Sequence, residues 1–162
     1  MTTITCYDYD GNPHLVPTDY IQFRPAIYGI LLDKDQVLLQ RHQPTRNLQP
    51  PGRILQVHEQ PAPALRRYFR SLVGFTPHVE STLIIDDQYI WDPAQEKAYH
   101  VVRTYYAVTR PAAVTMMPVD DTHDAYPEWV PLAGLSREQL QFGYEAIILG
   151  EERLTLQQKQ QA

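Results

Sequence analysis

The chain has 162 residues, of which 43% are hydrophobic and 20% are charged, and these values are typical of one globular domain. Its formal net charge of −5 argues against nucleic acid and anionic membrane surfaces as partners, because both are negatively charged. A single cysteine, Cys6, excludes an internal disulfide, and the lack of a secretory signal and of an apolar run of roughly 20 residues predicts a cytoplasmic protein without a membrane span.

The N-terminal part of the chain is predicted to consist of strands. Residues 4–9 and 14–16 flank the Asp-Gly turn signal of residues 10–13, which predicts a short hairpin. Residues 24–32 and 36–41 are nearly continuous apolar runs, a pattern that is typical of buried strands.

A loop and a helix are predicted next. The prolines and the glycine of residues 42–52 predict a loop, and residues 54–57 are predicted to form a short strand. Residues 61–73 change to helical spacing, with apolar side chains at Leu65, Phe69 and Leu72. Two prolines fit the first turn of this helix and Gly74 fits its C-terminal cap, so the sequence predicts a helix of about three turns.

The C-terminal half continues with strands and ends in a helix. The strands, chosen for their β propensity, are predicted at 80–86, 98–109 and 128–131. Turn-rich loops are predicted at 87–96 and 111–127. A Ser-x-x-Gln capping box at Ser136 begins the last helix, whose apolar stripe is Leu140, Tyr144, Ile147 and Ile148. The Gln-rich end, 157–162, is expected to fray.

The most informative segment is residues 50–75, PPGRILQVHEQPAPALRRYFRSLVGF. A Pro-Gly pair is followed in it, at fixed intervals, by Glu59, Arg67, Phe69, Gly74 and Phe75. In this spacing the segment resembles the box of the Nudix family, whose members cleave nucleoside diphosphates linked to another group. Residues 24–41 resemble the opening hairpin of that family and residues 128–132 resemble its last strand, so the resemblance covers about residues 22–150.

Three acidic positions of the family's pattern are occupied by other residues. Where the box has glutamates on its helix, this chain has Tyr68, Ser71 and Leu72, and Arg53 replaces the first glycine. The family's carboxylates share one helix face and converge on a divalent cation, which neutralises the diphosphate and activates a water molecule. The resemblance therefore implies Mg²⁺ or Mn²⁺ as the cofactor, whereas Glu59 alone predicts a weak metal site.

Glu59 and Asp121 are the candidate catalytic residues. Glu59 is interpreted as a metal ligand or a base, or else as a surface residue ahead of the helix. Asp121 lies in an acidic loop, 120–124, at the place where many Nudix relatives carry a general base. A solvated acidic loop is the alternative interpretation of that segment.

Arginines of the same motif are the candidate ligands of a phosphate. Arg53, Arg66 and Arg70 would replace the metal as a direct clamp, because guanidinium groups bind phosphate oxygens in pairs. The alternative is that Arg66 and Arg70 are solvated surface residues. By resemblance, the residues with a structural role in the motif are Gly52, Arg67 and Gly74.

The sequence predicts one Nudix-like domain over residues 1–162. Residues 1–21 would form an N-terminal hairpin extension, residues 22–150 the core and residues 151–162 a frayed tail. The order of strands and helices predicts an α/β (α+β) fold, an α/β/α sandwich around a mixed sheet.

The resemblance implies a hydrolase acting on acid anhydrides, but the replaced glutamates predict that standard metal-dependent hydrolysis is weak or lost. We expect a protein that binds a nucleotide or a related phosphorylated metabolite. One alternative is an active hydrolase with a relocated metal site, in which Glu59 combines with Asp121, Asp124 or Glu96. The other is a non-catalytic interaction domain, which is compatible with a homodimer because relatives often pair.

Overall fold

Nine strands form a single sheet within residues 1–42, 46–112 and 125–161, which are the residues that the computed structural model describes. The strands are β1 (Thr3–Tyr7), β2 (Pro13–Pro17), β3 (Ile21–Asp33), β4 (Gln36–His42), β5 (Leu48–Gln49), β6 (Gly52–Ile54), β7 (His78–Asp92), β8 (Lys97–Thr109) and β9 (Ala125–Pro131). The helices are α1 (Pro61–Val73) and α2 (Tyr144–Gln161), with short 3-10 turns at Thr18–Tyr20 and Arg137–Gln139.

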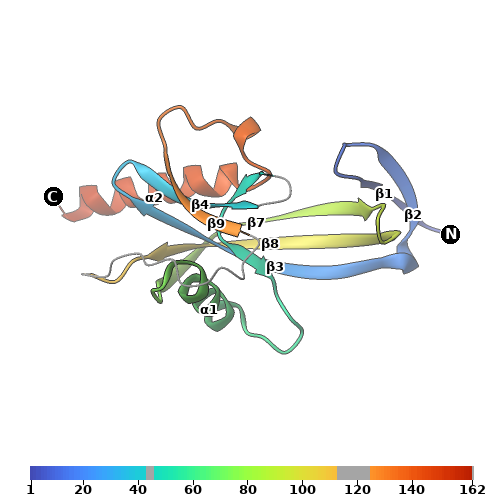
Figure 1. The fold of residues 1–162 in the computed structure, drawn as a ribbon, viewed down its shortest axis with the longest axis horizontal. Helices are drawn as coiled ribbons and strands as arrows, with labels where there is room; N and C mark the ends of the chain where they lie inside the picture. The colour runs from blue at the N-terminus through green and yellow to red at the C-terminus, as the bar shows by residue number, and fades with distance from the viewer. Residues whose placement is uncertain (43–45, 113–124, 162) are drawn as a thin grey trace.

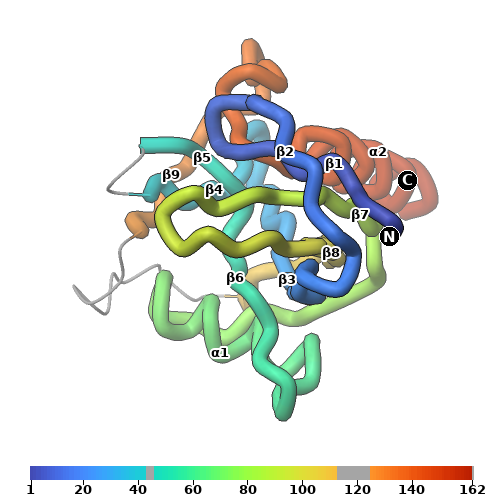
Figure 2. Tube along the Cα trace, turned by 90° about the vertical axis from the view of Figure 1, so that its right-hand side faces the viewer, coloured from blue at the N-terminus to red at the C-terminus, as the bar shows by residue number. Residues whose placement is uncertain are grey.

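The sheet is mixed, as the sequence predicts. Its main path runs β2-β1-β7-β8-β3-β4-β5, with β6 paired to β3 and β9 paired to β4. The long central strands β3 and β8 are parallel, whereas β7 and β8 form an antiparallel hairpin. Figures 1 and 2 both place α1 on one side of the sheet, and α2 together with the β1–β2 hairpin on the other. This arrangement confirms the predicted α/β/α architecture with an N-terminal hairpin.

Two hydrophobic cores lie on opposite faces of the sheet, which explains why the sequence of β3 is apolar almost without interruption. Alternate residues of β3 contribute to the core under α2, including Ala26, Tyr28 and Ile30. The residues between them contribute to the core under α1, including Ile27 and Leu31. The same alternation fixes which side chains of each strand can reach the candidate site.

Helix α1 has the bounds that the sequence predicts. Pro61 occupies its first turn, where the missing N–H has no helical partner to lose. Gly74 ends it in the left-handed region at φ 83°, and its N–H donates to the carbonyl of Arg70. The buried stripe of the helix consists of Ala64, Leu65, Phe69, Leu72 and Val73.

The prediction of a loop at 87–96 is wrong over most of its length. β7 continues to Asp92, and residues 93–96 alone form the turn to β8. The polar residues of β7 are paired across the hairpin, Asp86 with Arg103 and Asp87 with His100. Cross-strand pairing therefore overrides the turn propensity of these residues.

The C-terminal helix also departs from the prediction. The capping box of Ser136 and Gln139 is present, but it closes a single 3-10 turn, and α2 begins at Tyr144. The end that was expected to fray is helical to Gln161, in keeping with the helix propensity of its Gln and Lys residues. None of the helices described is long and apolar enough to cross a membrane.

Smaller differences concern the segment between β4 and α1. The strand predicted at 54–57 is β6, which begins at Gly52 and ends at Ile54, and the predicted loop before it contains the two residues of β5. The predicted loop at 111–127 ends earlier, since β9 begins at Ala125.

Candidate functional site

A cavity of about 590 Å³ lies where the motif meets the sheet. Its lining comes from the turn of the N-terminal hairpin, from β3, from the end of β4, from β6 and from α1, and it includes Tyr9, Tyr28, His42, Gly52, Arg53 and Tyr68. Gly52, Arg53 and Tyr68 belong to the motif, so the structure places the motif's first half and one face of α1 at this cavity. We call it the motif cavity.

Tyr68, which stands at the first of the three replaced acidic positions, is held in a hydrogen-bond chain. Its hydroxyl donates to Oε1 of Gln40 at 2.5 Å, and Nε2 of Gln40 donates to the carbonyl of Gly52 at 3.4 Å. The Gln40 side chain is fully buried. Burial raises the pKa of Tyr68 to about 12, so the phenol is neutral at pH 7.

The face of α1 that would hold a divalent cation does not offer the ligands for one. Leu72 is 3% exposed and belongs to the core under α1, and Ser71 and Tyr68 offer hydroxyls where Mg²⁺ prefers carboxylates. The residues that the structure describes contain no cluster of three or more His, Cys, Asp or Glu side chains suited to a metal. These residues therefore do not fit the cofactor that the resemblance implies.

Glu59, the remaining carboxylate of the motif, is bound by two arginines. Its Oε1 lies 2.5 Å from Nη2 of Arg53 and its Oε2 lies 2.9 Å from Nη2 of Arg67. The backbone N–H of Gln56 also donates to Oε1, at 3.0 Å. This N–H, followed by the two arginines, lowers the pKa of Glu59 to about 2, which makes it a poor proton acceptor at neutral pH.

The ion pairs of Glu59 give a stability prediction. The folded-state pKa of Glu59 lies below its ordinary value of about 4.5, so the contribution of Glu59 to stability is complete above pH 5 and is lost as the pH falls towards 2. We expect Glu59→Gln to lower the melting temperature at pH 7 and to match the wild type more closely as the pH falls from 5 to 3. Thermal melts at four pH values measure this. A difference in melting temperature between the two proteins that stays constant from pH 5 to pH 3 would contradict the lowered pKa of Glu59.

The other proposed phosphate ligands do not lie at the cavity. Arg66 and Arg70 are each two positions from Tyr68, so at 3.6 residues per turn they project about 160° away from it around α1. Arg70 is exposed and Arg66 is half-buried. The structure thus brings Arg53 alone of the three arginines to the motif cavity.

Of the three further acidic candidates, the structure describes only Glu96. Asp121 and Asp124 lie outside the described residues, so their predicted roles stay predictions. Glu96 lies in the β7–β8 turn and lines a different cavity, together with residues of β2 such as His14.

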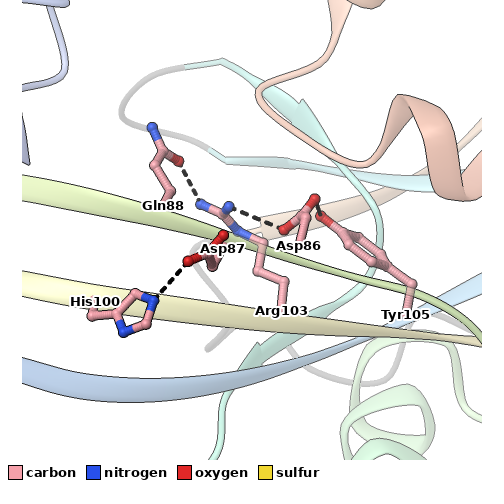
Figure 3. A network of polar contacts seen from close by, with 6 residues as sticks. All are labelled: Asp86, Asp87, Gln88, His100, Arg103 and Tyr105. Carbon is pink, nitrogen blue, oxygen red and sulfur yellow. Dashed lines mark hydrogen bonds and ion pairs between the residues drawn. The ribbon is translucent and has the colours of Figure 1, made fainter.

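A partly buried polar network on β7 and β8 is not visible in the sequence (Figure 3). Arg103 is 6% exposed, and its Nη1 and Nη2 lie 3.4 Å from Asp86 and 2.9 Å from Gln88. Asp86 also accepts a hydrogen bond from Tyr105. On the other face of β7, Asp87 pairs with His100 at 2.8 Å. The alternation of polar residues 86 and 88 is the available signal, but the turn propensity of residues 87–96 predicts a loop from residue 87 onwards.

Comparison with known proteins identifies the fold of this chain. No protein-family model and no curated protein sequence matches the chain. Among solved structures, an ADP-ribose pyrophosphatase from Streptococcus suis has a TM-score of 0.58 and 14% identity, over 80% of this chain and 90% of that one.

Two further solved structures agree with it. A MutT Nudix hydrolase from Burkholderia pseudomallei has a TM-score of 0.57 and 19% identity, over 80% of this chain and 97% of that one. A Nudix-family hydrolase from Clostridium perfringens has a TM-score of 0.56 and 17% identity, over 84% of this chain and 99% of that one. The chain therefore has the fold of the Nudix hydrolases.

Proposed function

We propose that this protein binds a nucleotide or a related small phosphorylated molecule in the motif cavity and that it has lost the standard metal-dependent hydrolysis. The observation that carries the proposal is the chain Tyr68–Gln40–Gly52, in which a neutral phenol stands where the box has its first helix glutamate. The cavity beside this chain has a volume of about 590 Å³, within the range of about 300–1,000 Å³ that is usual for small-molecule sites.

The charges at the cavity favour a phosphate. Arg53 and Arg67 carry two positive charges and Glu59 carries one negative charge, which leaves a net charge of +1. Arg53 lines the cavity, and its side chain is 43% exposed, so its guanidinium group can donate to a phosphate oxygen without leaving Glu59. A structurally similar protein is an ADP-ribose pyrophosphatase, which supports a nucleoside diphosphate as the class of ligand.

The proposal is tested by calorimetric titration of ADP-ribose, NADH and nucleoside triphosphates, with and without Mg²⁺. We expect binding that does not need Mg²⁺, and we expect Arg53→Ala to weaken it about tenfold because a hydrogen bond to a charged group is lost. Arg70→Ala is the matched control, since it removes an equal charge from the side of α1 that lies opposite Tyr68 and the motif cavity. Its affinity should equal that of the wild type.

Two results would overturn the proposal. Turnover that requires Mg²⁺, at a rate near the roughly 10 s⁻¹ that is typical of enzymes, would show that the hydrolytic chemistry is retained. If none of these compounds binds, the protein has no phosphate site in the motif cavity. An equal loss in Arg53→Ala and Arg70→Ala would move the site from the cavity to the outer face of α1.

The alternatives fit the described residues less well. In a relocated metal site Glu59 would be a ligand, but both of its carboxylate oxygens are engaged by arginines. Crystals soaked in Mn²⁺ test that alternative directly, by anomalous density at Glu59. An interaction domain without a ligand would have a cleft filled by its own side chains, with Leu72 and Tyr68 in the metal position. Leu72 is buried and Tyr68 is bonded to Gln40, which fits that alternative, but the motif cavity beside them is open, which does not. A cytoplasmic location and a homodimer stay predictions from the sequence and the resemblance.

A further inference from the structure

The cavity that is lined by Glu96 and His14 has a volume of about 480 Å³. Its walls come from β2, from the 3-10 turn that follows β2, from the beginning of β3 and from the adjoining ends of β7 and β8. Figure 1 shows these elements together at one end of the molecule. The cavity shares no lining residue with the motif cavity, so it is a separate site. We call it the β2 cavity.

Two aromatic side chains, Tyr20 and Trp91, line the β2 cavity. Tyr20 is 71% exposed, so its ring is available to a ligand. Trp91 is half-buried and stacks on the ring of His14, with 5.5 Å between the ring centres. Nε2 of His14 in turn lies 3.0 Å from Oδ2 of Asp8. These contacts hold the indole in place, so the cavity has a fixed aromatic wall beside a more mobile tyrosine.

The polar side chains of the β2 cavity include both donors and an acceptor. Glu96 and Lys97 follow each other at the end of the β7–β8 turn, and both are exposed. Within the part of the chain that the structure describes, neither of them forms a side-chain hydrogen bond or an ion pair. Gln22 accepts a hydrogen bond from Arg24 through Oε1, which leaves its amide N–H groups as donors. A ligand can therefore donate to Glu96 and accept from Lys97 and Gln22.

The edge of β2 is closed to a strand of another chain. The N–H of Thr18 donates to the carbonyl of Thr2, so the even-numbered residues of β2 bond to β1 in this antiparallel ladder. The odd-numbered residues direct their backbone groups outward, and two of them, Pro13 and Pro17, have no N–H. Leu15 is left as the one outward donor of β2, which is too few for a docked strand. We therefore look for a small molecule as the occupant.

The mixture of groups in the β2 cavity fits a sugar. The charges of Glu96 and Lys97 cancel, so this pair does not favour an ion of either sign. A hydroxyl group can both donate to a carboxylate and accept from an ammonium or amide N–H, so neighbouring hydroxyls on one ring can satisfy these groups together. The C–H groups of the same ring are apolar and can pack on an aromatic side chain. The volume of about 480 Å³ lies in the range of about 300–1,000 Å³ that is usual for small-molecule sites.

We propose that the β2 cavity binds a sugar ring, with Tyr20 packed on its C–H groups and with Glu96 and Lys97 hydrogen-bonded to its hydroxyl groups. This inference goes beyond the proposed function, because it assigns a ligand to a site that has no lining residue in common with the motif cavity. The N-terminal hairpin is then the element that builds a second binding site.

The test uses the two tryptophans of the chain, Trp91 and Trp129, as reporters in ¹H–¹⁵N NMR spectra. Their indole N–H signals are assigned with Trp91→Phe, and the wild type is titrated with glucose, galactose, mannose, ribose, N-acetylglucosamine and glycerol. At least one sugar should shift the signal of Trp91 and leave that of Trp129 in place, with a dissociation constant of about 1 mM. Glycerol, which has hydroxyls but no ring, should shift neither signal.

Tyr20→Ala tests the aromatic contact. We expect it to weaken the sugar about tenfold, because the packing of an aromatic ring on the ligand is lost. Tyr7→Ala is the matched control, since Tyr7 is also an exposed tyrosine of the N-terminal part but does not line the β2 cavity. Its affinity for the sugar should equal that of the wild type.

Glu96→Gly separates binding from folding. Glu96 has a left-handed backbone, with φ 51°, which is unfavourable for a residue with a Cβ but not for glycine. The variant should therefore melt no lower than the wild type, while it loses the acceptor and binds the sugar about tenfold more weakly. Lys34→Gly is the matched control, because Lys34 is exposed, has φ 56° and lies outside the β2 cavity. It should bind the sugar as the wild type does.

Several results would overturn the inference. If no sugar moves the signal of Trp91, or if glycerol moves it as far, the β2 cavity has no sugar site. Equal effects of Tyr20→Ala and Tyr7→Ala, or a Glu96→Gly protein that binds as the wild type does, would separate sugar binding from these side chains. If Glu96→Gly melts lower than the wild type, Tyr20→Ala decides. These results leave the proposed function standing, since Arg53→Ala tests it at the motif cavity with other ligands.

Discussion

Leu72→Glu, which restores a glutamate of the family pattern, is expected to lower the free energy of unfolding by about 3–5 kcal/mol at pH 7, the usual cost of an uncompensated buried charge. Leu72 is 3% exposed and packs with Leu65, Phe69 and Val108 in the core under α1. A carboxylate there would lose its water without gaining a partner. Since total stabilities are about 5–15 kcal/mol, the variant would be close to unfolding, and urea titration measures the loss.

The control for this variant is Leu72→Gln, which has nearly the same shape but no charge. Its expected cost is smaller, about 1–3 kcal/mol, because a buried amide loses hydrogen bonds but no charge. Burial would raise the folded-state pKa of the introduced carboxyl above its unfolded value. The extra loss in Leu72→Glu should therefore vanish below pH 4, where both states are protonated, and grow as the pH rises through the folded-state pKa.

Two results would contradict the interpretation of this position. If Leu72→Glu and Leu72→Gln unfold at the same urea concentration at pH 7, position 72 is accessible to water. If Mg²⁺ restores the stability of Leu72→Glu but not that of Leu72→Gln, this face of α1 can hold a metal as soon as a carboxylate is present. Either result would weaken the argument that the motif has been converted from a metal site into part of the core.

Local signals explain which part of the fold could be predicted. Helix α1 was predicted with its correct bounds, because Pro61, the spacing of its apolar residues and Gly74 are all signals within one short segment. The replaced acids were visible in the same way, as departures from a spacing. The sequence leaves open what Tyr68 and Leu72 contact. The structure places Leu72 in the core under α1 and bonds the hydroxyl of Tyr68 to Gln40.

Long-range pairing explains what could not be predicted. Arg103 reaches its partners only because β7 and β8 form a hairpin with Asp86 opposite Arg103. The sequence predicts that the strand ends at Asp86 and that a loop begins at Asp87. Tyr9 reaches the cleft only because β1 pairs with the far end of β7, at Tyr7 and Ile90. No pattern within either segment shows these contacts, so they could not be derived from the sequence.

Gly52→Ala is expected to destabilise the protein by about 3 kcal/mol, the upper part of the range for overpacked sites. A Cβ atom at this position would lie 2.0 Å from the carbonyl oxygen of Ile27 and 2.7 Å from Cα of Tyr28, both of them backbone atoms that cannot rotate away. β6 would have to separate from β3, and the carbonyl of Gly52 would move away from Gln40. We therefore expect the variant also to lose affinity for the nucleotide, measured by calorimetry.

Gly134→Ala is the control that separates crowding from backbone strain. Gly134 has φ +80° and open space around its Cβ position, so its substitution costs about 1 kcal/mol of strain alone. Gly52 also has a positive φ, +159°, so about 1 kcal/mol of its loss of about 3 kcal/mol is strain. The remaining difference of about 2 kcal/mol between the two variants measures the close approach of β6 to β3 at the floor of the motif cavity. Equal losses in the two variants, or a Gly52→Ala protein that binds nucleotides as the wild type does, would show that the cavity floor does not depend on this contact. A larger loss in Gly52→Ala, together with weaker nucleotide binding, would tie the shape of the cleft to the hydrogen-bond chain Tyr68–Gln40–Gly52.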